Sequence, residues 1–237
     1  MDELPQIRAA ARAAAQDPDL ISRRFDLARQ TAAVFQSVGE EFLVAGSLIG
    51  GDRVTGTSQW GNGSDETVAV ALLFLVGADL VAGCSSLFAE RRHYAGAALI
   101  RQLVEVEYLA WAFETRDRDG ERWLRSTREE RDEFFRPVRL REAAAGRFKG
   151  RDYGYHCELG GHPVPRAEIL FRANACDTAQ LLLSDALGHA GRIWDHLRTW
   201  AKEHRHLPSV EAHGPEMGAR YRALWADDPL VHLPPPP

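Results

Sequence analysis

An all-α, single-domain fold is predicted by three features of the 237-residue sequence. Apolar residues recur at steps of three and four over several long stretches, which is the spacing of amphipathic helices. Two neighbouring stretches, 66–89 and 93–115, are apolar almost throughout, as expected for the centre of a bundle. The chain is also long enough to bury a core without disulfides. We expect five or six helices in residues 1–206, followed by a Pro-rich, partly disordered tail at 207–237.

Two helices are expected before the central pair. Residues 1–18 are rich in Ala and Arg and predict a short, frayed helix. Residues 19–45 carry apolar side chains at helical spacing and predict an amphipathic helix. The Gly-rich stretch 46–65 predicts a loop, in which Ser64 or Asp65 is placed to cap the next helix.

The two apolar stretches predict an antiparallel helical hairpin, because only residues 90–92 separate them. The first is barely long enough to cross a membrane. Asp79 lies near its centre, and a carboxylate there costs about 2.5–3.5 kcal/mol on membrane insertion. We therefore expect a buried core helix of a soluble protein and no membrane partner.

The second half of the chain alternates helical and irregular patterns. Residues 119–147 combine many charges with an apolar stripe, and Pro137 should kink or divide this helix. Residues 149–165 contain several Gly and Pro and predict an irregular loop. Residues 174–204 predict a long amphipathic helix, and a short helix is expected near 215–226.

Charged residues within the apolar helices form the first candidate site. Arg101 and Glu105 are four residues apart and therefore share one helix face. Buried ions cost several kcal/mol unless they are paired, so we expect these two to pair with each other and with Asp79 on the facing helix. Glu107 lies on another side and is expected at the rim. The cluster is either a purely structural network, or a site that binds a small polar or anionic ligand or organises a dimer. Arg suits the first kind of site because it can bind a carboxylate or phosphate with two hydrogen bonds.

The loop downstream supplies further candidate ligand-binding residues. Tyr155, His156 and His162 lie close together on Gly- and Pro-rich backbone, with Tyr153 and Glu158 beside them. Such a loop is typical of a segment that closes over a site built on rigid helices, and histidine titrates near neutral pH.

The pattern of these two segments resembles a family of bacterial all-helical proteins known only as a domain of unknown function. The family shows R-x-x-x-E on one helix and a later Y…H segment, which match Arg101/Glu105 and the stretch from Tyr155 to His162. The resemblance covers residues 67–165. It implies a shared polar site of Arg101, Glu105 and His162, and it implies no reaction.

A more distant resemblance suggests a ribonuclease as an alternative function. Helical dimeric ribonucleases of the HEPN class, which serve in stress and phage defence, show an R-x(4–6)-H motif near a helix end. Arg198 and His204 fit this spacing. In this alternative His204 acts as acid or base and Arg198 stabilises the phosphate, and nucleic acid is a partner in this case alone. Otherwise catalytic residues stay unknown.

A helical metal-carboxylate protein is the second alternative. Glu90/His93 and Glu203/His206 have the E-x-x-H spacing of such proteins, but these need two more inward Glu residues, for which only Glu105 is a candidate. We therefore assign no metal ligand and no cofactor.

Composition and termini predict a cytoplasmic protein. The net charge of −5 argues against a mainly electrostatic nucleic-acid binder. Three cysteines without C-x-x-C spacing fit a reducing compartment, and the acidic N-terminus lacks the apolar segment of a signal peptide. A homodimer is expected, because Trp194, Leu197 and Trp200 give residues 174–204 an extra apolar face that needs a cover.

Overall fold

The computed structural model describes residues 5–48, 51–52, 57–58, 64–148, 150–204 and 207–231. Its long helices are α2 (Pro18–Leu48), α3 (Asp65–Ala89), α4 (His93–Thr115), α9 (Ala175–Glu203) and α10 (Leu207–Asp227). The shorter elements are α1 (Pro5–Ala15), β1 (Gly51–Asp52), β2 (Thr57–Ser58), α5 (Asp119–Arg125), α6 (Arg128–Glu130), η1 (Arg131–Phe135), α7 (Pro137–Ala143), α8 (Gly150–His156), η2 (Cys157–Gly161) and η3 (Pro165–Phe171).

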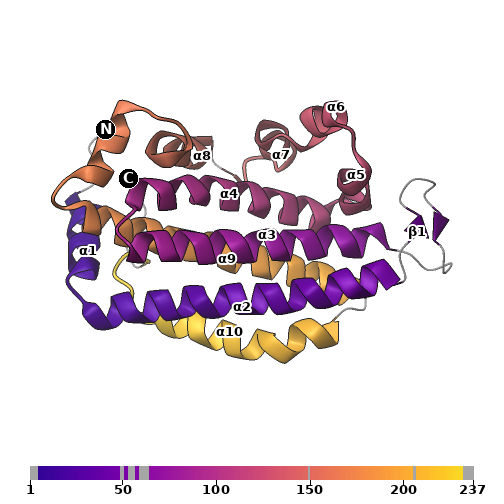
Figure 1. The fold of residues 1–237 in the computed structure, drawn as a ribbon, viewed down its shortest axis with the longest axis horizontal. Coiled ribbons are helices and arrows are strands. Elements are labelled where there is room, and N and C mark those ends of the chain that lie inside the picture. Colours follow the sequence, from indigo (N-terminus) through magenta and orange to yellow (C-terminus); the bar gives the residue numbers. More distant parts are fainter. Residues whose placement is uncertain are drawn as a thin grey trace.

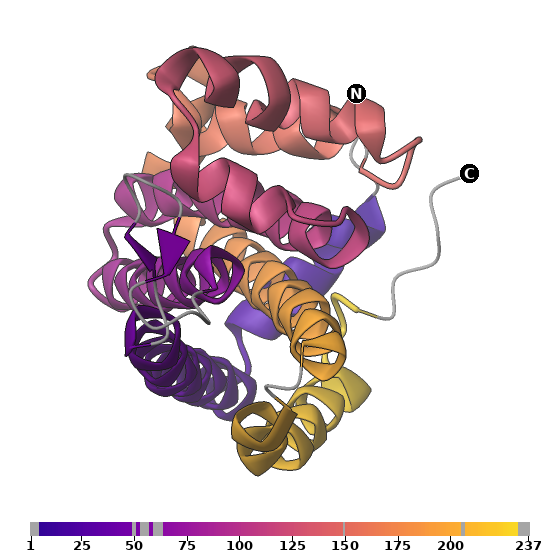
Figure 2. The same cartoon turned by 90° about the vertical axis from the view of Figure 1, so that its right-hand side faces the viewer.

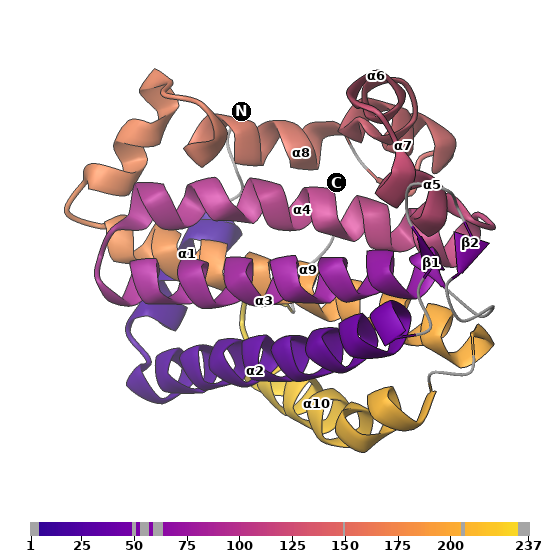
Figure 3. The ribbon, with the colours of Figure 1, turned by 45° about the vertical axis from the view of Figure 1, so that its right-hand side comes forward.

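The long helices form a bundle around α9, and the predicted all-α fold is confirmed. Figure 1 shows α2, α3, α4, α9 and α10 lying side by side along the longest axis. Viewed from the end, α9 occupies the middle of the bundle, and the shorter helices from α5 to α8 lie across the outer side of α4 (Figure 2). β1 and β2 make a minimal antiparallel ribbon at one end (Figure 3).

Local sequence signals set most helix starts. The Ser64 side chain accepts a hydrogen bond from the Thr67 amide at 3.1 Å, so Ser64 caps α3 as predicted. Asp17 does the same for the start of α2 through the Leu20 amide. Pro137 begins α7 and separates it from η1, which confirms that the predicted helix 119–147 is divided here.

Aromatic side chains from three helices fill the core. Phe35 of α2 packs edge-on against Phe74 of α3, with ring centroids 5.4 Å apart, and both rings contact Trp194 of α9. Trp194, Leu197 and Trp200 are all buried within the single chain. The apolar face that suggested a homodimer is therefore covered by α2, α3 and α10 of the same chain. This face no longer supports the homodimer, which stays a prediction.

Helix α3 is the one helix in the described part of the chain that is long and apolar enough to cross a membrane. In the bundle, 67% of its most apolar window is buried against other helices. Its central acidic residue, Asp79, is exposed.

Two segments differ from the sequence-based expectations. Residues 150–161 are helical rather than irregular, because Leu159 and Gly160 are buried against α4 and fix the segment. Residues 207–227 form the full-length helix α10 rather than a tail, because Val210, Met217 and Tyr221 are buried against α2 and α9. The final prolines lie outside the described residues.

Candidate metal centre

Helices α4 and α9 face each other with matched carboxylates and imidazoles. Glu107 of α4 pairs with His189 of α9, and Glu114 pairs with His196. Both pairs link residues 82 positions apart in sequence, so the two helices run in the same direction. Seven residues separate the pairs, which is two helical turns and returns the side chains to the same interface.

The Glu107–His189 pair is the more deeply buried one. Glu107 is 3% exposed and His189 is 1% exposed. Oε2 of Glu107 lies 2.5 Å from Nδ1 of His189, and Arg192 donates from Nε to Oε1 of Glu107 at 2.8 Å. Burial alone raises the pKa of Glu107, but His189 and Arg192 outweigh it, so that the pKa lies below its ordinary value. Glu107 is therefore an anion, and the prediction of a rim position is wrong.

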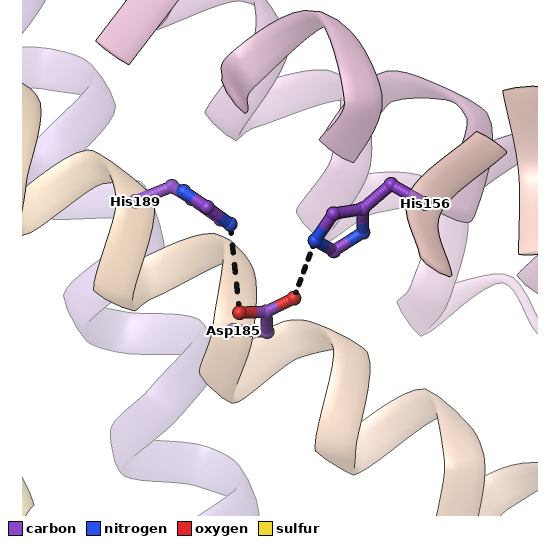
Figure 4. A group of neighbouring side chains, drawn as sticks. All are labelled: His156, Asp185 and His189. Atoms are coloured by element: carbon purple, nitrogen blue, oxygen red, sulfur yellow. Dashed lines mark ion pairs between the residues drawn. The ribbon is translucent and has the colours of Figure 1, made fainter. Parts of the chain in front are cut away.

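Asp185, one helical turn before His189 on α9, joins this pair to α8. Nε2 of His156 lies 3.1 Å from Oδ2 of Asp185, and Nε2 of His189 lies 3.5 Å from Oδ1 (Figure 4). The two imidazoles point at the carboxylate from opposite sides. Burial raises the pKa of Asp185, but the nearby His189 and His156 lower it more, and the carboxyl group stays charged.

These three side chains form the metal-binding trio: His156, Asp185 and His189. One ligand atom from each lies within 4.8 Å of the other two. Donors around a tetrahedral zinc ion are about 3.3 Å apart, given bonds of about 2.0–2.2 Å. The two imidazoles contact different oxygens of Asp185, at 3.1 Å and 3.5 Å, so the three donors must draw closer together to share one ion.

The burial of the trio is uneven, and that unevenness makes the site suitable for an ion. Both imidazoles are buried, whereas the Asp185 side chain is 31% exposed. Nε2 of His189 is buried and makes no hydrogen bond to any described residue. A buried ring nitrogen without a hydrogen bond costs free energy, which a bound cation relieves.

Cys84 of α3 is near Asp185 but is not among the three grouped ligands. It is buried, and burial followed by the Asp185 carboxylate raises the pKa of its thiol. A thiol must lose its proton to bind a metal, and both effects oppose that loss.

The predicted Arg101/Glu105 cluster exists but is smaller and more exposed than expected. Arg101 lies 3.3 Å from Glu105, and the Tyr153 hydroxyl bridges them by accepting from Arg101 at 3.1 Å and donating to Glu105 at 2.7 Å. Their side chains are 30% and 35% exposed. Burial and the Glu105 hydrogen bond raise the pKa of Tyr153 to about 12.

Other predicted candidates lie apart from this cluster. Asp79 is exposed on α3 rather than paired with Arg101, because it faces away from the hairpin interface. His162 is exposed at the end of η2, and Tyr155 packs edge-on against His156. Of the downstream candidates, His156 alone joins the trio.

The residues of the two alternative functions are not brought together either. Six positions separate Arg198 and His204, which places them about 120° apart around α9, and the His204 ring stacks on Trp200. Glu90 is exposed at the end of α3 while His93 is buried at the start of α4. His206 lies outside the described residues.

Two residues of this centre, Asp185 and His189, went unnoticed in the sequence, and Glu107 was expected at the rim. Their signal is the D-x-x-x-H spacing of Asp185 and His189 on one helix face, together with two Glu and two His at equal seven-residue intervals. Neither pattern identifies a metal site unless it is known which residues of α4 lie beside which residues of α9.

Comparison with known proteins adds no relative. No family model matches the chain, and no curated protein or solved structure matches it. The resemblance to a bacterial domain of unknown function, and the more distant one to HEPN ribonucleases, thus stay predictions.

Proposed function

We propose that this protein binds one divalent transition-metal ion through Nε2 of His156, Nε2 of His189 and the carboxylate of Asp185. The observation that carries the proposal is the convergence of these three groups from α8 and α9 on one point, with both imidazoles buried. Two imidazoles and a carboxylate suit Zn²⁺, Fe²⁺ or Mn²⁺ better than Ca²⁺ or Mg²⁺, which prefer oxygen ligands.

The number of ligands favours an open site over a closed structural one. Structural zinc sites are usually filled by four protein ligands, whereas catalytic sites have three and keep a position for water or substrate. The described residues supply three, and the Asp185 side chain is partly exposed. The proposed ion therefore binds water or a small exogenous donor on the Asp185 side, where it can lower the pKa of that water.

Calorimetric titration of the metal-stripped protein with Zn²⁺ tests this proposal. We expect a stoichiometry of one. Asp185→Asn and His156→Gln should each weaken binding by more than about 100-fold, since even supporting residues around a metal contribute 10–100-fold. His162→Gln is the matched control, because His162 is an exposed histidine on the neighbouring turn. Absence of stoichiometric binding, or equal binding by Asp185→Asn, refutes the proposal and leaves the trio as a structural network.

A further inference from the structure

We propose that Glu107 is a positioning residue of this metal site, which holds the proton of His189 on Nδ1 and so directs the Nε2 lone pair at the ion. This inference rests on the proposed metal binding. It assigns a role to a carboxylate that touches neither the ion nor solvent.

The first step is the placement of the His189 proton. A neutral imidazole carries one proton, and the nitrogen that binds a metal must be the other one. Nδ1 lies 2.5 Å from Oε2 of Glu107. A carboxylate can only accept, so a bare Nδ1 at this distance would set two lone pairs against each other. Nδ1 therefore donates to Glu107. A bare Nε2 facing the Asp185 carboxylate 3.5 Å away would set lone pairs against each other in the same way, and the proposed cation between them removes that repulsion.

A second neighbour of Nδ1 does not reverse this assignment. Nη2 of Arg192 lies 2.8 Å from the same Nδ1, and a guanidinium can only donate. If Nδ1 accepted from Arg192, the anionic Glu107 would have no proton to accept from His189. Of the two contacts that Nδ1 makes, the one to Glu107 is shorter and involves a negative charge. Nδ1 therefore donates to Glu107 rather than accepting from Arg192. Arg192 then acts on Glu107, through the 2.8 Å bond from Nε to Oε1.

The third step concerns the rigidity of the Glu107 carboxylate and the His189 ring. Glu107 and His189 lie on long helices packed in parallel at the bundle centre, and both side chains are almost fully buried. Because Arg192 holds one carboxylate oxygen and His189 the other, the carboxylate plane is fixed. The ring of His189 cannot turn over without breaking the buried hydrogen bond. This is the carboxylate–histidine–metal arrangement in which the outer carboxylate orients the ligand and raises its basicity.

The chain contains its own control for this effect. Glu114 and His196 make the same carboxylate–Nδ1 contact on the same two helices, two turns further along. Nε2 of His196, however, faces Arg147 at 3.4 Å, and His196 is not part of the trio. A loss of metal affinity specific to Glu107 is therefore separable from a general loosening of the α4–α9 interface.

The test compares Glu107→Gln with Glu114→Gln in the Zn²⁺ titration. We expect Glu107→Gln to weaken Zn²⁺ binding by about 10–100-fold, since its neutral amide accepts the proton more weakly and also permits the other tautomer. Glu114→Gln should bind like the wild type. Equal affinities of Glu107→Gln and wild type, or equal losses in both variants, overturn the inference. If the wild type itself fails to bind Zn²⁺, the proposed function fails first.

A measurement on the unmutated protein covers the case in which Glu107→Gln does not fold. In the Zn²⁺-loaded wild type, ¹⁵N–¹H spectra of the histidine rings should show His189 protonated at Nδ1, with this proton protected from exchange, and zinc bound at Nε2. Zinc on Nδ1, or a proton on Nε2, contradicts the inference directly.

Discussion

At the scale of single residues, the charge of Glu107 depends on its partners and so makes stability depend on pH. Its folded pKa lies below the ordinary value of 4.5 because His189 and Arg192 outweigh the effect of burial. A lowered pKa contributes stability above the unfolded value, and this contribution is lost as pH falls through the folded pKa. The contribution of Glu107 is therefore complete at neutral pH and declines below about pH 4.5.

This predicts the behaviour of Glu107→Gln in urea unfolding. At pH 7 the variant should be less stable by about 1–3 kcal/mol, because a neutral amide replaces the charged acceptor of the buried His189 hydrogen bond and of the exposed Arg192 side chain. The difference from wild type should shrink as pH falls below about 4.5 and through the lowered folded pKa of Glu107. Glu158→Gln is the control, since the Glu158 pair with Arg166 is exposed and should change stability by less than about 1 kcal/mol. A gap that stays constant with pH contradicts the argument.

The Tyr153 hydroxyl belongs to the Arg101 cluster and is not part of the metal-binding trio. Tyr153→Phe removes two hydrogen bonds to charged groups that are partly exposed, and we expect a loss of about 1–2 kcal/mol in unfolding free energy. Zn²⁺ affinity should stay at the wild-type value, because Tyr153 contacts neither Asp185 nor His189. A parallel loss of Zn²⁺ affinity would instead show that the Arg101 cluster and the trio belong to one site.

At the scale of elements, the turn from α8 into η2 determines where His156 lies. A Cβ added at Gly160 would lie 2.4 Å from the backbone nitrogen of Ala98 on α4, so this glycine permits backbone-to-backbone contact. The contact holds η2 on α4 and thereby holds the preceding His156 against Asp185.

Gly160→Ala should therefore push η2 away from α4. We expect a loss of about 1–3 kcal/mol in stability, as for other overpacked sites, together with weaker Zn²⁺ binding. Gly154→Ala on α8 is the matched control, because a Cβ there has no heavy atom within 4 Å and should be neutral or slightly stabilising. Thermal melts and Zn²⁺ titrations of both variants give the result, and equal behaviour of the two would refute the packing argument.

Whether an element could be predicted from the sequence depends on whether local spacing or a long-range contact orders it. Periodic apolar spacing was enough to predict the long helices from α2 to α4 and α9, whose amphipathic or wholly apolar patterns are local. The helices at 150–161 contain several Gly and were predicted as a loop, because the burial of Gly160 against Ala98 that orders them is a long-range contact. The trio was missed for a related reason: Asp185 and His189 gain their meaning only when α8, packed on α4, brings the His156 side chain to Asp185 of α9.

At the scale of the whole molecule, one buried ion pair ties helix α2, near the start of the chain, to the end of the last helix. Arg24 of α2 and Asp228, directly after α10, are both fully buried and joined by three hydrogen bonds, from Nε at 3.0 Å and from Nη2 at 2.6 Å and 2.7 Å. Gln180 and Ser184 of α9 complete the network by bonding Arg24 and Asp228 respectively. Helix α10 is therefore part of the cooperative unit, even though its sequence resembles a Pro-containing tail.

Asp228→Asn should lower the free energy of unfolding by about 3–5 kcal/mol, because it leaves the Arg24 guanidinium buried without a counter-charge. Asp227→Asn is the matched control one residue earlier, since Asp227 pairs with Arg23 at the surface and should change stability by less than about 1 kcal/mol. Urea unfolding followed by circular dichroism measures both, and limited proteolysis reports on α10. Release of α10 in Asp228→Asn before the rest of the bundle unfolds, or equal stability of the two variants, would mean that α10 is an independent appendage and not a structural part of the bundle.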